Sequence, residues 1–216
     1  MADIKLIVFD WDGTLSDSAQ RIVDAVHVGA KLVGLPERSN QDIRNIIGLG
    51  LMESFRELYS ADNEVLFEPF ADAYRDAYTN TGIQAALFPN VLATLDVLRD
   101  RFTLAVATGK SRVGLDRELQ ETNLGEYFIA TRCADETKPK PDPLMLRQIL
   151  EVSGIAAENT LMIGDTDHDI HTAKNAGCLP IAVTCGAQLL PRLEVAEPAA
   201  ILDTVADLPR WLGENL

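Results

Sequence analysis

The segment Asp10-Trp11-Asp12-Gly13-Thr14-Leu15 directly follows the mostly apolar run 4–9, and it restricts the possible folds more than any other part of the chain. A short apolar run that ends at a glycine turn is typical of a buried strand in a parallel sheet. Open α/β sheets bind ligands at the carboxyl ends of their strands. The segment therefore predicts an α/β fold that carries Asp10 and Asp12 at its ligand-binding edge.

Two carboxylates this close repel each other unless a cation, a shared proton or a basic side chain lies nearby. An aspartate can also attack phosphorus as a nucleophile, and the resulting aspartyl-phosphate divides one difficult hydrolysis into two easier steps. A second aspartate then carries the proton. An isolated Asp-x-Asp-Gly is equally compatible with a plain turn, so the later motifs decide between the two interpretations.

Two further segments supply groups suited to a phosphate. The predicted strand 102–107 is followed by Thr108 and Gly109, a hydroxyl and a flexible backbone that can donate hydrogen bonds to phosphate oxygens. The glycine spacing of a nucleotide-binding P-loop is absent there. Downstream, prolines hold Lys138 and Lys140 on a rigid loop ahead of a predicted helix over 144–152, although the same composition suits a solvated connection.

The last motif follows a strand predicted over 160–164: Asp165 comes directly after it, and Asp169 follows where a helix is expected to begin. Carboxylate oxygens are hard ligands that suit Mg²⁺. Asp165 is the expected direct ligand. Asp169 either orients metal-bound water or the lysine, or complements the helix dipole. Asp167 is expected to face solvent, and the three histidines show no ligand arrangement.

In this order, the four motifs resemble those of haloacid dehalogenase-superfamily phosphatases, and segment 46–50 resembles the phosphoglycolate-phosphatase branch of that superfamily. The resemblance implies that Asp10 is the nucleophile and that Asp12 is the general acid and base. It implies a Mg²⁺ held by the Asp10 carboxylate, the Asp12 backbone carbonyl and Asp165, with support from Asp169. Phosphate binding falls to Thr108, the Gly109 amide and Lys138. Lys140 is the rival for the lysine's role, but only Lys138 begins a Lys-Pro-x-Pro-Asp pattern.

The resemblance also predicts a Rossmann-like parallel-sheet core with an inserted small helical cap. Residues 1–15 and 89–216 are assigned to the core and residues 16–88 to the cap, because helical periodicity runs through the latter without strand-like alternation. The hinges are expected near 15–17 and 87–90. In the cap, Arg44 is the first candidate for binding a substrate carboxylate and Arg21 the second. The glycines of loop 46–50 permit either close approach to a ligand or a simple helix-helix turn.

Composition limits the partners. The 216 residues include 19 basic and 33 acidic side chains, and the formal net charge of -14 argues against nucleic acid and anionic membranes as partners. Three cysteines without metal-ligand spacing predict free thiols. No apolar run approaches the length of a membrane span and no signal-like start is present, so a cytoplasmic protein is expected. The sequence leaves open whether it is a monomer or a homodimer.

The expected function is a magnesium-dependent phosphatase of small phosphorylated metabolites, with phosphoglycolate as the first substrate to consider. Asp12 supports phosphate transfer, because dehalogenases of this superfamily have a non-acidic residue at that position. Sugar phosphates, nucleotides and a phosphomutase reaction remain alternatives. A phospho-accepting signalling protein or a non-catalytic binding protein would be a different class, and neither needs the complete set of acids and lysine.

Overall fold

The computed structural model describes residues 3–80 and 86–215. Its centre is a six-stranded parallel sheet with the strand order β3-β2-β1-β4-β5-β6. The strands are β1 (Leu6–Phe9), β2 (Thr103–Thr108), β3 (Ala130–Cys133), β4 (Thr160–Gly164), β5 (Leu179–Val183) and β6 (Ala200–Leu202). This arrangement confirms the predicted α/β, Rossmann-like class.

Side-chain alternation along β1 explains why both faces of the sheet are covered. Ile7 and Phe9 belong to one apolar cluster, which includes residues of α5 and α10, whereas Leu6 and Val8 belong to another, which includes residues of α7 and α8. All four side chains are fully buried. A strand that is apolar on both faces is typical of the centre of a parallel sheet.

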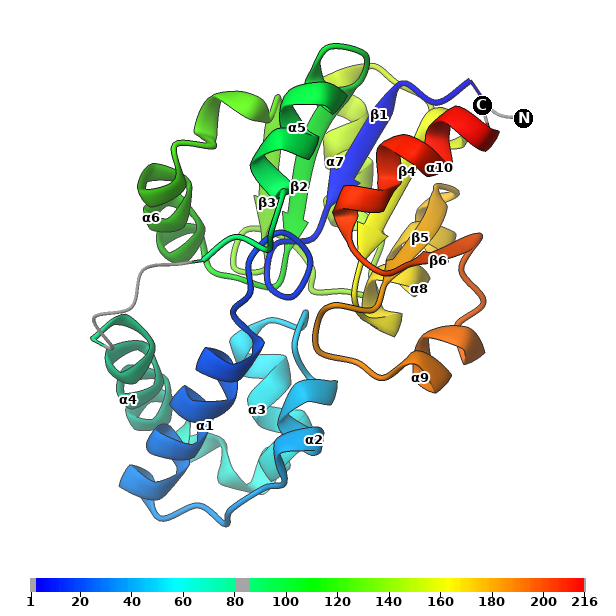
Figure 1. The fold of residues 1–216 in the computed structure, drawn as a ribbon. Coiled ribbons are helices and arrows are strands. Elements are labelled where there is room, and N and C mark those ends of the chain that lie inside the picture. Colours follow the sequence, from blue (N-terminus) through cyan, green and yellow to red (C-terminus); the bar gives the residue numbers. More distant parts are fainter. Residues whose placement is uncertain (1–2, 81–85, 216) are drawn as a thin grey trace.

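Five helices of the sheet domain lie on the connections between strands, and a sixth follows the last strand (Figure 1). They are α5 (Val91–Arg99), α6 (Arg112–Thr122), α7 (Leu144–Ser153), α8 (Asp167–Ala176), α9 (Leu190–Val195) and α10 (Leu208–Asn215). Short 3₁₀ turns span Gly125–Tyr127, Ala157–Asn159 and Val205–Asp207. No element was predicted at α6, α9 or β3, so the sequence expectations missed all three.

Between β1 and α5 the chain forms a helical layer that lies across the carboxyl end of the sheet (Figure 1). It contains α1 (Ala19–Val33), α2 (Asn40–Asn45), α3 (Leu51–Tyr59), the 3₁₀ turn Ala61–Leu66 and α4 (Phe67–Thr79). Its own apolar core is built around Phe55, whose ring lies 5.1 Å from that of Phe70 and 5.5 Å from that of Phe67, centroid to centroid. We call α1–α4 the cap helices.

The two connections to the cap helices run side by side. Asp17 donates a backbone hydrogen bond to Ala86 at 2.8 Å, and Phe88 donates one to Leu15 at 3.0 Å. An isolated bridge between Ser16 and Leu87 joins the same two segments. These contacts lie at the predicted crossings. The assignment of residues 16–88 to a separate cap domain stays a prediction.

Strand register brings the functional segments to one edge. Phe9 pairs with Val106 on one side and with Ile163 on the other. The residues that follow these strands therefore meet at the carboxyl end of the sheet, beneath the cap helices.

Cys133, Cys178 and Cys185 are free thiols. Among the described residues, no helix is long and apolar enough to span a bilayer.

Candidate active site

Asp10 is the first residue after β1, and its side chain is fully shielded from solvent. Its backbone amide donates to the carbonyl of Ile163 at 2.8 Å, so the neighbouring strand fixes its position. Oδ1 accepts a hydrogen bond from Lys140 Nζ at 2.8 Å. Oδ2 has no hydrogen-bond partner among the described residues. Burial raises the pKa of Asp10 well above its ordinary value, although the Lys140 ammonium opposes this shift.

Lys140, and not Lys138, is the lysine of the cluster, which corrects the preference drawn from the sequence. Its ammonium group bridges Asp10 and Asp169, with Nζ 2.5 Å from Asp169 Oδ1, and its side chain is completely buried. Burial would lower the pKa of Lys140, but the two carboxylates outweigh burial and raise it. Lys138 has a side chain that is 68% exposed, and its ammonium lies 3.6 Å from Asp142.

Asp165 and Asp169 complete a buried acidic triad with Asp10, and the three residues offer carboxylate oxygens within 4.8 Å of one another. Asp165 accepts hydrogen bonds from Thr14 Oγ1 at 2.9 Å and from the Ala187 amide at 2.7 Å. Burial and the Asp169 charge raise the pKa of Asp165 to about 7. Asp169 Oδ2 accepts from the Thr166 amide and hydroxyl, which closes a capping box at the start of α8.

The triad fits a divalent cation. The cluster holds three acids and a single ammonium group, which contacts two of them, so a cation would offset the remaining buried negative charge. Asp10 Oδ2 adds a buried oxygen with no hydrogen-bond donor within the described part of the chain. Oxygen ligands of this kind suit Mg²⁺ better than softer metals. Asp10, Asp165 and Asp169 would hold the metal.

Glycines let the backbone approach the triad closely. A β carbon at Gly13 or at Gly186 would overlap the Asp165 carboxylate, so neither position has room for a side chain. Gly13 also has a φ of +83°, which favours glycine. The turn after β1 and the loop after β5 therefore lie in close contact with Asp165, the acid that follows β4.

The Asp12 side chain contacts groups outside the triad, next to the start of the cap helices. Its Oδ1 accepts a hydrogen bond from Ser18 Oγ at 2.6 Å and lies 3.0 Å from Lys110 Nζ. Asp12 therefore lies two residues after Asp10 but contacts a different set of groups, which is what separate roles for the two acids require. Its proposed metal contact is through the backbone carbonyl, and that contact stays a prediction.

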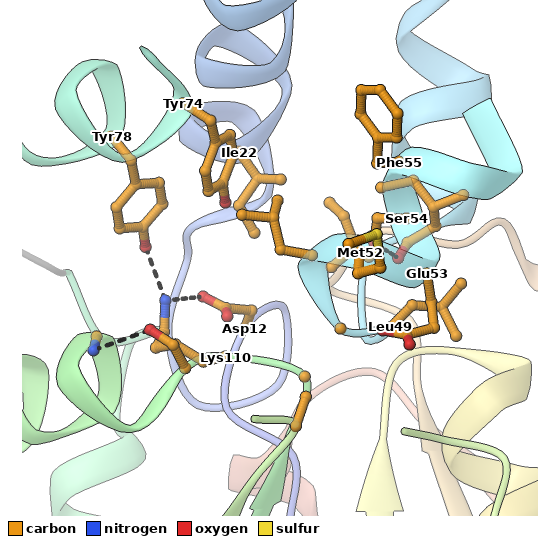
Figure 2. Close-up of a pocket in the computed structure, with 18 of the residues that line it drawn as sticks. Asp12, Ile22, Leu49, Met52, Glu53, Ser54, Phe55, Tyr74, Tyr78 and Lys110 are labelled. Carbon is orange, nitrogen blue, oxygen red and sulfur yellow. Dashed lines mark hydrogen bonds and ion pairs between the residues drawn. The ribbon is translucent and has the colours of Figure 1, made fainter. Parts of the chain in front are cut away.

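Lys110 and Glu118 are site residues that the sequence analysis missed. Lys110 Nζ lies 3.2 Å from Glu118 Oε1. It also donates to the Tyr78 hydroxyl at 3.1 Å (Figure 2). Burial would lower the pKa of Lys110, but Asp12 and Glu118 outweigh it and raise the pKa well above its ordinary value. Glu118 also accepts hydrogen bonds from Trp11 Nε1 at 2.6 Å and from the Tyr78 hydroxyl at 2.8 Å.

Thr108 and Gly109 lie where β2 ends, beside Asp10. Thr108 is fully buried, and its Oγ1 accepts a hydrogen bond from the Lys110 amide at 3.1 Å. A β carbon at Gly109 would overlap the backbone of Gly48 and Leu49, so the loop between α2 and α3 rests directly on this turn. The glycine-containing cap loop thus covers the predicted phosphate-binding segment.

Arg44 and Arg21 do not reach the cavity above Asp10, contrary to the sequence prediction. The Arg44 guanidinium donates to Gln20 Oε1 at 2.9 Å. The Arg21 guanidinium donates to the Tyr78 carbonyl at 2.7 Å and lies over the Tyr78 ring. Neither arginine lines the cavity. Arg75 and Arg117 are the cap and core arginines that do.

The cavity itself has a volume of about 730 Å³ and lies between the cap helices and the sheet edge. Asp10, Asp12, Thr108, Gly109 and Lys110 line its floor. Apolar side chains of α1, α3 and α4 line the cap side (Figure 2). A substrate in this cavity would have its phosphoryl group next to Asp10 and its remaining part against the cap helices.

The sequence profile of the haloacid dehalogenase-like hydrolases matches residues 7–183. A phosphoglycolate phosphatase of Vibrio cholerae is 33% identical over 218 residues and covers 96% of both chains. The probable phosphatase IndB of Dickeya dadantii is 32% identical over 210 residues, which cover 94% of this chain and 91% of that protein. A haloacid dehalogenase-like hydrolase from Streptococcus pneumoniae has a similar structure, with a TM-score of 0.85, 27% identity and coverage of 98% and 100%.

The chain therefore belongs to the haloacid dehalogenase-like hydrolase family. Within that family it is a phosphatase, a hydrolase of phosphoric monoesters, similar to phosphoglycolate phosphatases. Both statements agree with what the sequence motifs predict.

Proposed function

We propose that the protein is a magnesium-dependent phosphatase that hydrolyses small phosphorylated metabolites through an aspartyl-phosphate on Asp10. The observation that carries the proposal is the placement of Asp10 within a buried cluster that combines the Lys140 ammonium with Asp165 and Asp169. Buried, preorganised charges of this kind are what phosphoryl transfer requires.

In the first step, a carboxylate oxygen of Asp10 attacks phosphorus, an O–P bond forms, and the bond to the alcohol oxygen breaks. Asp12 donates its proton to the departing alcohol oxygen. In the second step, Asp12 takes a proton from water, the water oxygen attacks phosphorus, and the Asp10 carboxylate is released with inorganic phosphate. The separate surroundings of the two acids support this division of roles.

The other residues bind and orient the phosphoryl group. The Thr108 hydroxyl and the Gly109 amide are proposed to donate hydrogen bonds to its oxygens, and Lys140 to offset the charge shared with Asp10. When bound by Asp10, Asp165 and Asp169, Mg²⁺ supplies positive charge to the phosphate oxygens. The loop between α2 and α3 covers the Gly109 turn and excludes water from it.

The test is phosphate release from a panel of phosphate monoesters, with Mg²⁺ and with a chelator. We expect Mg²⁺-dependent release that disappears in Asp10→Asn. Asp100→Asn is the matched control, because Asp100 is an exposed acid at the end of α5. Full activity in Asp10→Asn, or equal activity with and without the metal, would contradict the proposal. Phosphoglycolate belongs in the panel because several similar proteins are named phosphoglycolate phosphatases.

A further inference from the structure

We infer that the preferred substrate is a phosphate monoester of an uncharged, apolar alcohol that is larger than glycolate. This inference rests on the proposed phosphatase function and specifies the substrate class of the same cavity. Three properties of the cavity support it. They are its volume, its mostly apolar cap side, and the fact that each basic side chain in its lining already interacts with another side chain.

The volume exceeds what a two-carbon acid needs. The cavity measures about 730 Å³, within the range of roughly 300–1,000 Å³ that is typical of sites for drug-sized ligands. It extends from Asp10 and Asp12 into the cap helices. Phosphoglycolate, with its phosphoryl group at Asp10, would leave most of this space without contacts, so its binding would gain little from the cap.

The cap side of the cavity is mostly apolar. Ile22 and Val26 of α1, Met52 and Phe55 of α3, and Tyr74 of α4 line it, and Figure 2 shows Tyr74 and Ile22 across the cavity from Met52. Burial raises the pKa of Tyr74, so its ring is an uncharged phenol at neutral pH. Burying apolar substrate surface against such a wall contributes favourable free energy, whereas burying an unpaired carboxylate there is costly.

Lys110 is the basic residue that lines the floor, and acids already offset its charge. Its ammonium lies 3.0 Å from Asp12 and 3.2 Å from Glu118, and its side chain is only 8% exposed. A substrate carboxylate that approached it would also approach those two acids. Lys110 therefore positions Asp12 rather than providing an unpaired site for an anion.

The remaining lining cations in the described ranges 3–80 and 86–215 are Arg75 and Arg117, and both have partners. Arg75 is 55% exposed and pairs with Asp72 at 2.9 Å. Arg117 donates to Thr79 Oγ1 at 3.0 Å and lies 3.8 Å from Glu121. Glu53 and Asp135 add acidic side chains to the lining, and the sequence of 81–85 contains no basic residue. These charges disfavour a second anionic group on the substrate.

The test uses the intact wild-type protein with Mg²⁺ and a series of linear alkyl phosphates, from ethyl to hexyl, together with 3-phenylpropyl phosphate and phosphoglycolate. The alkyl alcohols are leaving groups of similar basicity, so differences in kcat/KM report binding in the cavity. We expect kcat/KM to rise by roughly fourfold per added methylene and to be lowest for phosphoglycolate. A flat series, or phosphoglycolate as the best substrate, would overturn the inference and leave the phosphatase function intact.

A pair of variants separates the cap wall from general effects. Met52→Lys places an ammonium group in the cavity, so we expect it to lower kcat/KM for hexyl phosphate at least tenfold and to raise it for phosphoglycolate. Leu32→Lys makes the same kind of change on α1 at a side chain that is 70% exposed, and it should alter neither value. Equal effects of the two variants would contradict the assignment of Met52. Failure of the wild type to hydrolyse any ester would contradict the proposed function itself, and this inference with it.

Discussion

Lys140 Nζ lies 2.8 Å from Asp10 Oδ1, although the two residues are 130 positions apart and both side chains are almost completely shielded from solvent. The ammonium also contacts Asp169, so it neutralises part of a cluster that contains three acids. Removing one partner of a buried charged group is costly because the other charges remain desolvated. The pair therefore affects folding and, in the proposed mechanism, the charge that Asp10 presents to phosphorus.

Replacement of this lysine gives the first prediction. We expect Lys140→Met to lower kcat/KM by about 100-fold or more, because it removes a preorganised positive charge next to the reacting group. Lys138→Met changes the exposed lysine two residues earlier and should retain activity within about twofold. The measurement is steady-state phosphate release, with circular dichroism to confirm that each variant is folded. Greater loss in Lys138→Met would reverse the assignment.

Metal binding should stabilise the folded protein. The acidic triad carries excess negative charge, so saturating Mg²⁺ is expected to raise Tm, with about 2.7 kcal/mol of stabilisation at 100 times Kd. Asp165→Asn should lose most of this shift. Asp167→Asn is the matched control, because Asp167 interacts with Arg192 and Gln188 instead of the triad. Equal Mg²⁺-dependent shifts in both variants, measured by thermal unfolding, would remove Asp165 from the metal site.

The lowered pKa of Glu118 predicts that this residue contributes to stability in a pH-dependent way. Burial raises its pKa, but Lys110 and the hydrogen bonds from Trp11 and Tyr78 outweigh burial and lower it below the ordinary value of 4.5. A lowered folded-state pKa means that the unfolded state binds more protons, so the contribution is complete above the ordinary pKa and is lost as the pH falls through the folded-state pKa.

We therefore expect Glu118→Gln to be less stable than the wild type at neutral pH, by about 1–3 kcal/mol. The difference should shrink as the pH is lowered below 4.5, the ordinary pKa of a glutamate. Urea unfolding at a series of pH values measures both. A difference that grows toward acid pH would contradict the ion pair between Glu118 and Lys110.

The contact between the Gly109 turn and the cap loop gives a steric prediction. Gly109→Ala places a β carbon against the Gly48 and Leu49 backbone, so we expect kcat/KM to fall about tenfold or more and stability to fall by about 1–3 kcal/mol. Gly125→Ala adds a methyl group where no atom lies within 4 Å, and it should change stability by less than about 0.5 kcal/mol. Kinetics and urea unfolding of the pair distinguish the site-specific clash from a general glycine effect.

The sequence was sufficient for the strands that end in functional residues, because apolar runs followed by Asp10, Thr108 and Asp165 have a clear local pattern. The sequence could not show which of the two lysines lies beside Asp10. Lys138-Pro139-Lys140-Pro141 and Lys140-Pro141-Asp142-Pro143 both match Lys-Pro-x-Pro, and the following aspartate favoured the wrong one. In the structure Asp142 accepts a hydrogen bond from the Leu144 amide at the start of α7.

The residues that contact Asp12 could not be recognised in the sequence for a different reason. Glu118 lies in α6, where the sequence analysis predicted no element, and its partner Trp11 is 107 positions away. Arg44 had the opposite problem, because a basic residue before the glycine loop suggested a substrate contact, whereas its guanidinium interacts with Gln20. Local sequence does not determine which of these side chains turn toward the cavity, since that depends on how the cap helices pack on the sheet.

The most direct test of the central claim is to trap the phosphorylated enzyme during turnover with Mg²⁺ and substrate. Rapid quenching followed by borohydride reduces an acyl phosphate to the alcohol, which converts an aspartyl-phosphate to homoserine that peptide mass spectrometry can locate. We predict homoserine at position 10 in the wild type and none in Asp10→Asn. Modification of a different acid, or rapid phosphate release by the Asp10→Asn variant, would contradict the assignment of Asp10 as the nucleophile.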